Sequence, residues 1–305
     1  MAESNGQAEK LVGIDVSPSR LLAVHIDGSN KVIDTLREER DVSKAASEQV
    51  ASFAKTAAER FGVGKIGVSV PGLVNSETGS VTYSAQIPEN TAVNLAEVIR
   101  SAGVEALIEN DANSAAYAEY KLGAGRGSDN MFYATIGTGI GGAFILNSGI
   151  WHGTAGYAGE FGYVAINSDG MRLEDVASSA NIVRRTRNRF NRDSTSSLGR
   201  LSEEEIGIKE IVAAAEEGDD FAILMLHRTG MYIGTAIASV INLMNVERIV
   251  VGGDIMQARH FVIDSIVDRA RELSFSPSFE KTQILPGELD DAASAIGAAL
   301  IANGR

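Results

Sequence analysis

The sequence predicts an α/β protein of two lobes, each built on a mixed sheet flanked by helices, with a cleft between the lobes. The chain has 305 residues, which is enough for two domains because folded units are commonly about 100 to 200 residues long. Short apolar strands alternate with helical patterns along it. A strand-turn-strand pattern begins at Leu11 and restarts at Met131, which indicates that the second lobe repeats the first.

The first lobe is expected to begin with an antiparallel meander. Its three strands are LVGIDV at 11–16, LLAVHI at 21–26 and KVIDTL at 31–36, which are separated by turn residues. The later elements in chain order are a helix over about 43–60, a strand at 65–70 that ends at Pro71-Gly72, a short helix at 95–101, a strand at 106–110 and a helix at 111–120.

The second lobe is expected to begin with two strands over 131–146, joined by the glycine turn GTGIGG. The later elements are helices over 179–192 and about 203–245, a strand at 247–251, the turn GGD, a helix at 261–273, a strand at 282–285 and a last helix at 291–302. We place the small lobe at residues 1–118 with 290–305, and the large lobe at 119–289.

The composition excludes several classes of function. The formal net charge is -13 and the pI is near 4.8, which disfavours nucleic acid and anionic membranes as partners, because both attract clustered Lys and Arg. No cysteine is present, so disulfides, thiolate catalysis and a cysteine-ligated zinc site are excluded. The polar first ten residues do not resemble a signal peptide, and no later apolar run is expected to span a membrane. We therefore expect a cytoplasmic protein.

The turn GTGIGG at 137–142 is the most informative local feature. Its glycines let backbone N–H groups approach an anion closely. Gly137, Gly139 and Gly142 also spell the dinucleotide-binding pattern, but that motif opens a helix, whereas AFILNSGIW continues as a strand. A phosphate-binding β-hairpin fits better, and a glycine turn without a ligand is the alternative.

Asn110 and Asp111 stand at the carboxyl end of a predicted strand, where open α/β sheets place ligand groups. Phosphoryl transfer to an alcohol requires positioning, charge neutralisation and one carboxylate that accepts the hydroxyl proton. Asp111 supplies such a carboxylate. The alternative is that Asp111 is the N-cap of the following helix.

Three further carboxylates are candidates, each with a plain structural alternative. Glu160 lies in a glycine-dense segment and offers an acceptor for sugar hydroxyls. Glu174 is a candidate ligand-binding carboxylate, but it could equally be a first-turn carboxylate that the helix dipole stabilises. Asp15 ends its strand and suits Mg²⁺ held through water, although an aspartate at a strand end is more often a turn residue.

Taken together and in order, the segments resemble the ROK family, a group of bacterial sugar kinases and sugar-responsive repressors. The family has the actin-like ATPase (ribonuclease H-like) fold. The resemblance extends from Gly13 to Ala302. The segments that carry it are VGIDV, the Pro71-Gly72 turn, IENDANSAAYAEY, ATIGTGIGGAFI, HGTAGYAGEFGYV, GTAIASVINLMNVERIVVGGDI and AIGAALIA.

The resemblance implies a role for each matching residue. Asp111 falls on the family's catalytic aspartate. The substrate-binding positions are Asn110, Glu160 and Glu174, with Gly72 and Tyr163 added. The nucleotide positions are Gly137, Thr138 and Gly139 in the second phosphate turn, Gly252 and Gly253 on the adenosine side, and Ser17 and Ser19 in the first phosphate hairpin. ATP is then expected in the large lobe, the sugar between the lobes, and a homodimer as the assembly.

Three departures from the family pattern matter. Tyr163 replaces the histidine that serves zinc and sugar, and the cysteine cluster is absent, so no zinc site is expected. Ser17-Pro18-Ser19 replaces Gly-Gly-Thr, and proline has no N–H to donate. Asp254 replaces a glycine and adds negative charge near the nucleotide.

The leading hypothesis is a hexokinase-type enzyme that uses Mg²⁺ and ATP, with Asp111 activating the 6-hydroxyl of a hexose, glucose first. The alternative is a non-catalytic sugar sensor derived from such a kinase. A DNA-binding repressor is the third hypothesis, and only ten residues precede the first strand, too few for the winged helix of the family's repressors.

Overall fold

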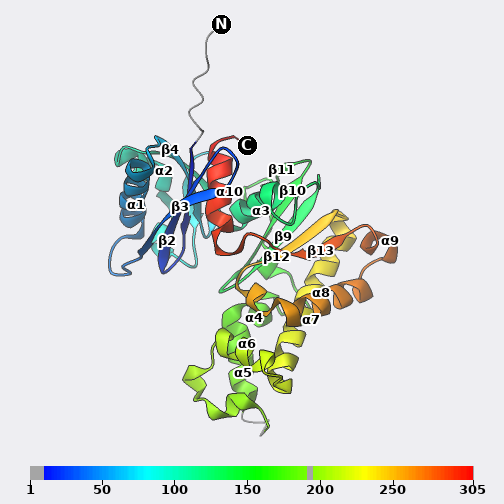
Figure 1. Cartoon of the computed structure of the whole chain (residues 1–305). Helices are drawn as coiled ribbons and strands as arrows, with labels where there is room; N and C mark the ends of the chain where they lie inside the picture. The colour runs from blue at the N-terminus through cyan, green and yellow to red at the C-terminus, as the bar shows by residue number, and fades with distance from the viewer. Residues whose placement is uncertain (1–9, 191–194, 305) are drawn as a thin grey trace. The chain divides into compact units, whose positions relative to one another are not determined.

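The computed structural model describes residues 10–190 and 195–304. These residues form two compact units (Figure 1). The first unit contains the described residues of Met1–Arg126, Ile150–Ala158 and Leu289–Arg305, and the second contains those of Gly127–Gly149 and Gly159–Glu288. The first unit thus also holds residues 119–126, 150–158 and 289, which were expected in the large lobe.

The first unit is built on a five-stranded mixed sheet of order β3-β2-β1-β4-β8. Its strands are β1 (Leu11–Val16), β2 (Arg20–Ile26), β3 (Val32–Glu39), β4 (Lys65–Val70) and β8 (Glu105–Asn110). The strands β1, β2 and β3 are antiparallel, which confirms the predicted meander, and β1, β4 and β8 are parallel. Every residue of β1 is buried, as expected of a strand covered on both faces.

Helices cover this sheet on both faces (Figure 1). They are α1 (Ala46–Phe61), α2 (Leu95–Ser101), α3 (Asp111–Leu122) and α10 (Ala293–Ala302). The helix α1 buries an apolar stripe that includes Val50, Phe53 and Ala57. The helix α10 consists largely of small and aliphatic residues and packs against β1, β4 and α3. It therefore joins the centre of the sheet to the helix that begins with Asp111.

A small sheet follows the Pro71-Gly72 turn and was not expected from the sequence. Its strands are β5 (Leu73–Asn75), β6 (Ser80–Tyr83) and β7 (Val93–Asn94). Each has only two to four residues, too few for the alternation of apolar and polar residues to be recognised. The short 3₁₀ helices of the whole chain are η1 (Pro88–Asn90), η2 (Phe161–Tyr163), η3 (Ser197–Arg200), η4 (Glu203–Glu205), η5 (Asp254–Ala258) and η6 (Asp290–Ala292).

The second unit has its own five-stranded sheet, of order β11-β10-β9-β12-β13. The strands are β9 (Met131–Ile136), β10 (Ile140–Leu146), β11 (Gly149–Ile150), β12 (Arg248–Gly252) and β13 (Gln283–Pro286). The antiparallel pair β9 and β10 confirms the predicted hairpin around the glycine turn. The strand β12 runs parallel to β9 and brings residue 252 level with residue 135.

The helices of the second unit are α4 (Glu174–Ala177), α5 (Ser179–Phe190), α6 (Ile208–Glu216), α7 (Asp220–Met244), α8 (Arg259–Leu273) and α9 (Ser276–Phe279). The predicted helical stretch 203–245 is divided between η4, α6 and α7. Gly218 has a φ of 86°, and the Asp219 side chain accepts a hydrogen bond from Ala222 N, which begins α7. Residues 191 and 192 of the predicted helix 179–192 lie outside the described residues.

The helix α7 is long and apolar enough to cross a membrane by length and composition alone, contrary to the expectation that no run reaches that length. However, 61% of its most apolar window is buried inside the structure. Gly230 and Gly234 face α8 so closely that a Cβ atom at either position would lie 2.6–2.7 Å from the nearest atom of α8. We therefore interpret α7 as a core helix of the second unit.

Candidate active site

In the first unit, β8 passes directly into α3 at Asn110 and Asp111. Asn110 is the N-cap, and its Oδ1 accepts a hydrogen bond of 3.0 Å from Asn113 N. Asp111 is the first helical residue. The alternative that Asp111 caps the helix is therefore wrong, because the preceding residue already does so.

Hydrogen bonds orient the Asp111 carboxylate. Its Oδ1 accepts from Ala112 N at 2.9 Å and from Asn110 Nδ2 at 3.0 Å. The same Asn110 amide donates to the Gly72 carbonyl at 2.9 Å. Gly72 has a φ of 123°, and a Cβ there would collide with the Tyr83 carbonyl. The structure thus brings the predicted residues Gly72, Asn110 and Asp111 together.

Asp15 is a buried carboxylate of this unit, with 9% of its surface exposed. Burial, and then the negative charge of Asp111, raise its pKa from 3.8 to about 7. Arg20 opposes this effect, because its Nη2 lies 3.7 Å from Asp15 Oδ2, while its Nη1 lies 3.5 Å from Asp291 Oδ2. Asp15 and Asp111 therefore act on each other electrostatically.

The turn between β1 and β2 holds Ser17 and Ser19, the positions of the first phosphate hairpin. Ser17 N and Oγ both donate to the Arg20 carbonyl, at 2.8 and 3.1 Å, and Arg20 N donates back to Ser17 Oγ. The buried Arg40 donates through Nη1 to the Pro18 carbonyl at 2.9 Å. The Ser17 hydroxyl thus stabilises the turn itself.

In the second unit, the glycine turn Gly137-Thr138-Gly139 joins β9 to β10. Gly137 N donates to Gly139 O at 3.0 Å, and Ser179 N donates to Gly137 O at 2.8 Å. Directly after the turn, Ile140 N donates to Glu174 Oε2 at 2.8 Å. The beginnings of α4 and α5 therefore hold this turn in place.

The second predicted glycine turn, at the end of β12, lies beside the first. Gly253 has a φ of 85°, and a Cβ there would come within 2.7 Å of Ile136 N. A Cβ at Gly137 would lie 3.3 Å from Asp254 Oδ2. Gly252 and Gly253 are thus close to Gly137, and the Asp254 carboxylate borders the phosphate turn.

Three predicted sugar-side residues also belong to the second unit. Although Glu160 is exposed, surrounding atoms partly desolvate its carboxylate and raise its pKa, and the charge of Glu174 raises it further. Tyr163 is 62% exposed, and the Arg172 guanidinium lies 4.8 Å from its ring centroid. This cation–π contact supports the packing interpretation of Tyr163.

Comparison with known proteins identifies the family. The model of the ROK family matches residues 11–305. The chain belongs to the ROK family.

Named relatives of this ROK-family chain include a glucokinase of Thermotoga maritima, 28% identical over 307 residues and covering 96% of each chain. Among solved structures, a ROK family glucokinase from Streptomyces griseus in complex with glucose and AMPPNP has a TM-score of 0.87 at 26% identity. That match covers 97% of this chain and 100% of the other. A ROK family transcriptional regulator, a homologue of the E. coli MLC protein, has a TM-score of 0.85 at 29% identity and covers 98% of this chain and 79% of the other.

These matches confirm the predicted actin-like ATPase fold. They support sugar phosphorylation as the class of function, while a transcriptional regulator is also among the relatives.

Neither Glu109 nor His152 is predicted from the sequence as a site residue, although His152 begins the segment HGTAGYAGEFGYV. In this ROK-family chain, His152 Nε2 lies 2.8 Å from Glu109 Oε2. The two residues are 43 positions apart. The sequence signal that could have pointed to this pair is that Glu109, a carboxylate, directly precedes Asn110.

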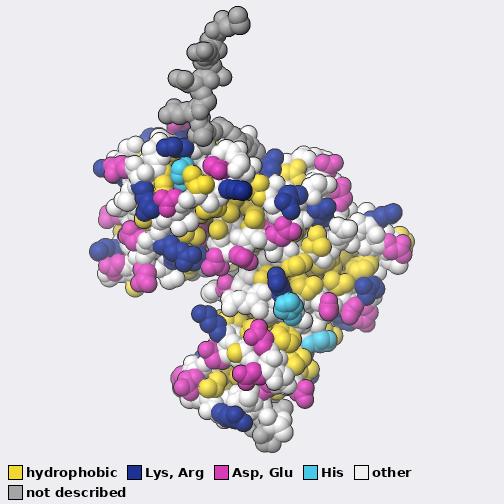
Figure 2. All heavy atoms as spheres, viewed as in Figure 1, with side chains coloured by type: hydrophobic (Ala, Val, Ile, Leu, Met, Phe, Trp, Pro, Cys, Tyr) yellow, Lys and Arg dark blue, Asp and Glu magenta, His cyan; other side chains and the backbone are white. Residues whose placement is uncertain are grey.

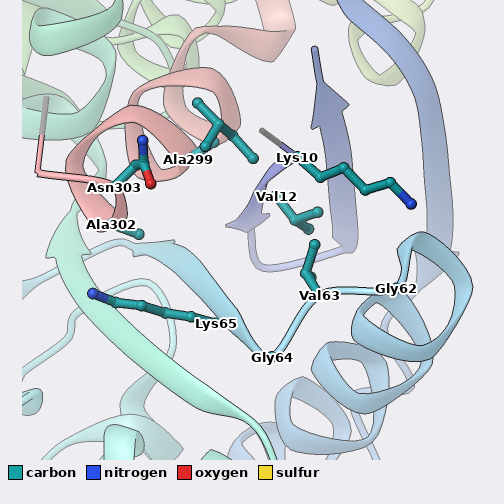
Figure 3. Close-up of a pocket in the computed structure, with 10 residues that line it drawn as sticks. Lys10, Val12, Gly62, Val63, Gly64, Lys65, Ala299, Ala302 and Asn303 are labelled. Carbon is teal, nitrogen blue, oxygen red and sulfur yellow. The ribbon is translucent and has the colours of Figure 1, made fainter. Parts of the chain in front are cut away.

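A pocket of about 390 Å³ lies elsewhere in the first unit (Figure 3). Its lining includes Lys10, Leu11 and Lys65, at the starts of β1 and β4, and Asn303 after α10. Because Asp15 is near the other end of β1, this pocket is not part of the candidate site. None of the predicted site residues lines it.

Proposed function

We propose that the chain is an ATP-dependent hexokinase that transfers the γ-phosphoryl group of ATP to the 6-hydroxyl of a hexose, with glucose as the first substrate to test. The observation that carries the proposal is the placement of Asp111. Its carboxylate stands at the carboxyl end of β8 and the N-terminus of α3, where ligand groups collect in open α/β sheets. Asn110 both caps the helix and orients this carboxylate.

In the proposed reaction, Asp111 accepts the proton of the 6-hydroxyl while the hydroxyl oxygen bonds to the γ-phosphorus. The bond from that phosphorus to the bridging oxygen of ADP then breaks. Asn110, Glu160 and Glu174 are proposed to bind the other sugar hydroxyls. Glu160 suits this role because its carboxylate is partly desolvated, which strengthens the hydrogen bonds that it accepts.

The donor chemistry around Asp15 fits a magnesium ion. Carboxylates suit Mg²⁺. Burial and then the negative charge of Asp111 raise the pKa of Asp15, and a nearby cation would offset the repulsion between the two carboxylates. When bound, the ion supplies charge neutralisation for the phosphates. Asp15 is proposed to hold it through water. Cytoplasmic location and homodimerisation stay predictions.

Asp111→Asn tests the proposal because it keeps the shape of the side chain and removes the base. We expect kcat to fall by about 10²- to 10⁴-fold with a smaller change in KM. The measurement is a coupled assay of ADP release with ATP and a panel of hexoses. Asp169→Asn, at an exposed carboxylate of the second unit, is the matched control. Absence of turnover with every hexose, or equal rates for wild type and Asp111→Asn, contradicts the proposal.

A non-catalytic sugar sensor is the second candidate, and two observations favour it. The turn at 17–19 contains Pro18, which donates no N–H, and its Ser17 hydroxyl stabilises the turn. The Asp254 carboxylate borders Gly137 and opposes an anionic phosphate there. Calorimetry with glucose and then Mg-ATP separates the candidates. A sensor is expected to bind the sugar but not Mg-ATP. Low-millimolar or tighter binding of Mg-ATP in the presence of sugar argues for the kinase.

A further inference from the structure

His152 and Glu109 form a hydrogen-bonded contact that the proposed reaction does not use. Glu109 lies near the end of β8, and its side chain is 3% exposed, whereas that of His152 is 33% exposed. The 2.8 Å separation of His152 Nε2 and Glu109 Oε2 is a short hydrogen bond. The Glu109 side chain raises the pKa of His152, first through this hydrogen bond and also through its charge, so the bond is assisted by charge.

The other carboxylate oxygen of Glu109 accepts hydrogen bonds from residues on either side of the proposed base. Glu109 Oε1 accepts from Asn110 N at 2.8 Å and from Asn113 Nδ2 at 3.0 Å. Asn110 in turn donates through Nδ2 to Asp111 Oδ1. Glu109 thus has one oxygen on His152 and the other on the residues that shape the N-terminus of α3.

His152 lies in a short segment, residues 150–158, that the second part of the chain contributes to the first unit. Residues 150–158 belong to the first unit, whereas the chain on both sides of them belongs to the second. Within this segment, Ala158 N donates to His152 O at 3.0 Å, and Tyr157 Oη donates to Thr82 Oγ1 at 3.1 Å. The contacts of Tyr157 with Thr82 and of His152 with Glu109 thus attach the segment to the first unit, and Glu160 lies two residues after its end.

We propose that His152 is a positioning residue: its hydrogen bond to Glu109 attaches residues 150–158 to the end of β8 and, through Glu109 and Asn110, fixes the orientation of the Asp111 carboxylate. Loss of His152 leaves the Oε2 atom of the buried Glu109 carboxylate without its donor, although Oε1 keeps Asn110 N and Asn113 Nδ2. An unpartnered buried carboxylate oxygen is costly. We therefore expect the Glu109 side chain to turn towards other donors, which moves Asn110 and Asn113. The catalytic part of this inference rests on the proposed hexokinase function.

The kinetic test compares His152→Ala with His152→Gln, whose amide can still donate to Glu109. We expect His152→Ala to lower kcat by about 10- to 100-fold, because small displacements of a catalytic group have effects of this order. We expect KM to change less, and His152→Gln to recover most of kcat. His227→Ala, at an exposed position of α7, is the matched control. Unchanged kcat in His152→Ala, or equal loss in both His152 variants, overturns the proposal.

A second readout does not depend on catalysis. Hydrogen exchange of the amides of residues 109–114 should accelerate in His152→Ala and return towards the wild-type rate in His152→Gln. Acceleration confined to 150–158 shows a purely local role and overturns the coupling. If wild type phosphorylates no hexose, the proposed function fails while this measurement still decides the coupling. If His152→Ala does not fold, Glu109→Gln, which keeps an oxygen for Asn110 and Asn113, is used in both assays.

Discussion

At the scale of single residues, Asp15 contributes a pH-dependent term to stability. Its ordinary pKa is 3.8 and its pKa in the folded chain is about 7. Between these values the folded state binds a proton that the unfolded state has released. The free energy of unfolding therefore falls as the pH rises from about 4 to about 7, and the stabilisation is absent above that range.

Asp15→Asn removes this term while keeping the size of the side chain. We expect the stability difference between the variant and wild type to shift in favour of the variant from pH 4 to pH 8, by on the order of 2–4 kcal/mol. Urea denaturation at both pH values gives the two differences. Asp169→Asn should show no such change between the two pH values. A constant difference between Asp15→Asn and wild type would mean that Asp15 does not titrate in this range.

The negative charge of Asp254 is expected to weaken the binding of Mg-ATP. Because its carboxylate borders Gly137 at the surface of the second unit, Asp254→Asn should tighten Mg-ATP binding by about two- to fivefold, as expected for an exposed like charge. Calorimetry at two salt concentrations measures this, and the gain should shrink at high salt. Weaker binding in the variant would instead assign Asp254 a direct role in holding the nucleotide.

At the scale of elements, the parts that the sequence predicted are those encoded by neighbouring residues. The hairpin β9–β10 follows from apolar runs around glycines, and β8–α3 follows from an apolar run before Asn110 and Asp111. Contacts between distant residues have no such local signal. The hydrogen bond between Ile140 and Glu174 and the contact of Arg20 with Asp291 exist only because the fold brings those elements together.

The helix α10 shows how an element far from Asp111 in sequence controls its position. A Cβ at Gly297 would collide with the Ser114 carbonyl of α3, and Ser294 Oγ donates to the Asp111 carbonyl at 3.3 Å. Gly297→Ala should therefore destabilise the protein by about 1–3 kcal/mol, as overpacking does, and lower kcat by displacing α3. Urea denaturation and the hexose assay measure the two effects.

The control for this prediction is Gly64→Ala. A Cβ at Gly64 would meet no atom within 4 Å, so we expect a change of less than about 0.5 kcal/mol. If Gly297→Ala were as stable as Gly64→Ala, α10 and α3 would have to separate without cost. The close packing of the two helices would then not be what holds Asp111.

At the scale of the whole molecule, charge separates the kinase and sensor proposals from a regulator that binds DNA. The net charge is -13, and on the face seen in Figure 2 the Lys and Arg side chains are dispersed among Asp and Glu. Binding to duplex DNA depends on neutralising several phosphates with clustered cations. A ROK transcriptional regulator is nevertheless among the structural relatives, so the point requires a direct test.

We expect this chain to enrich no duplex from a library of genomic fragments at physiological salt, with or without glucose. Fluorescence anisotropy on a labelled duplex should show binding no tighter than about 10⁻⁴ M, the weak end of non-specific affinity. A complex with a Kd near 10⁻⁸ M, weakened steeply by salt, would contradict this expectation, because such a slope requires several phosphate contacts. It would also require a cluster of Lys and Arg outside the face seen in Figure 2, where these side chains are dispersed.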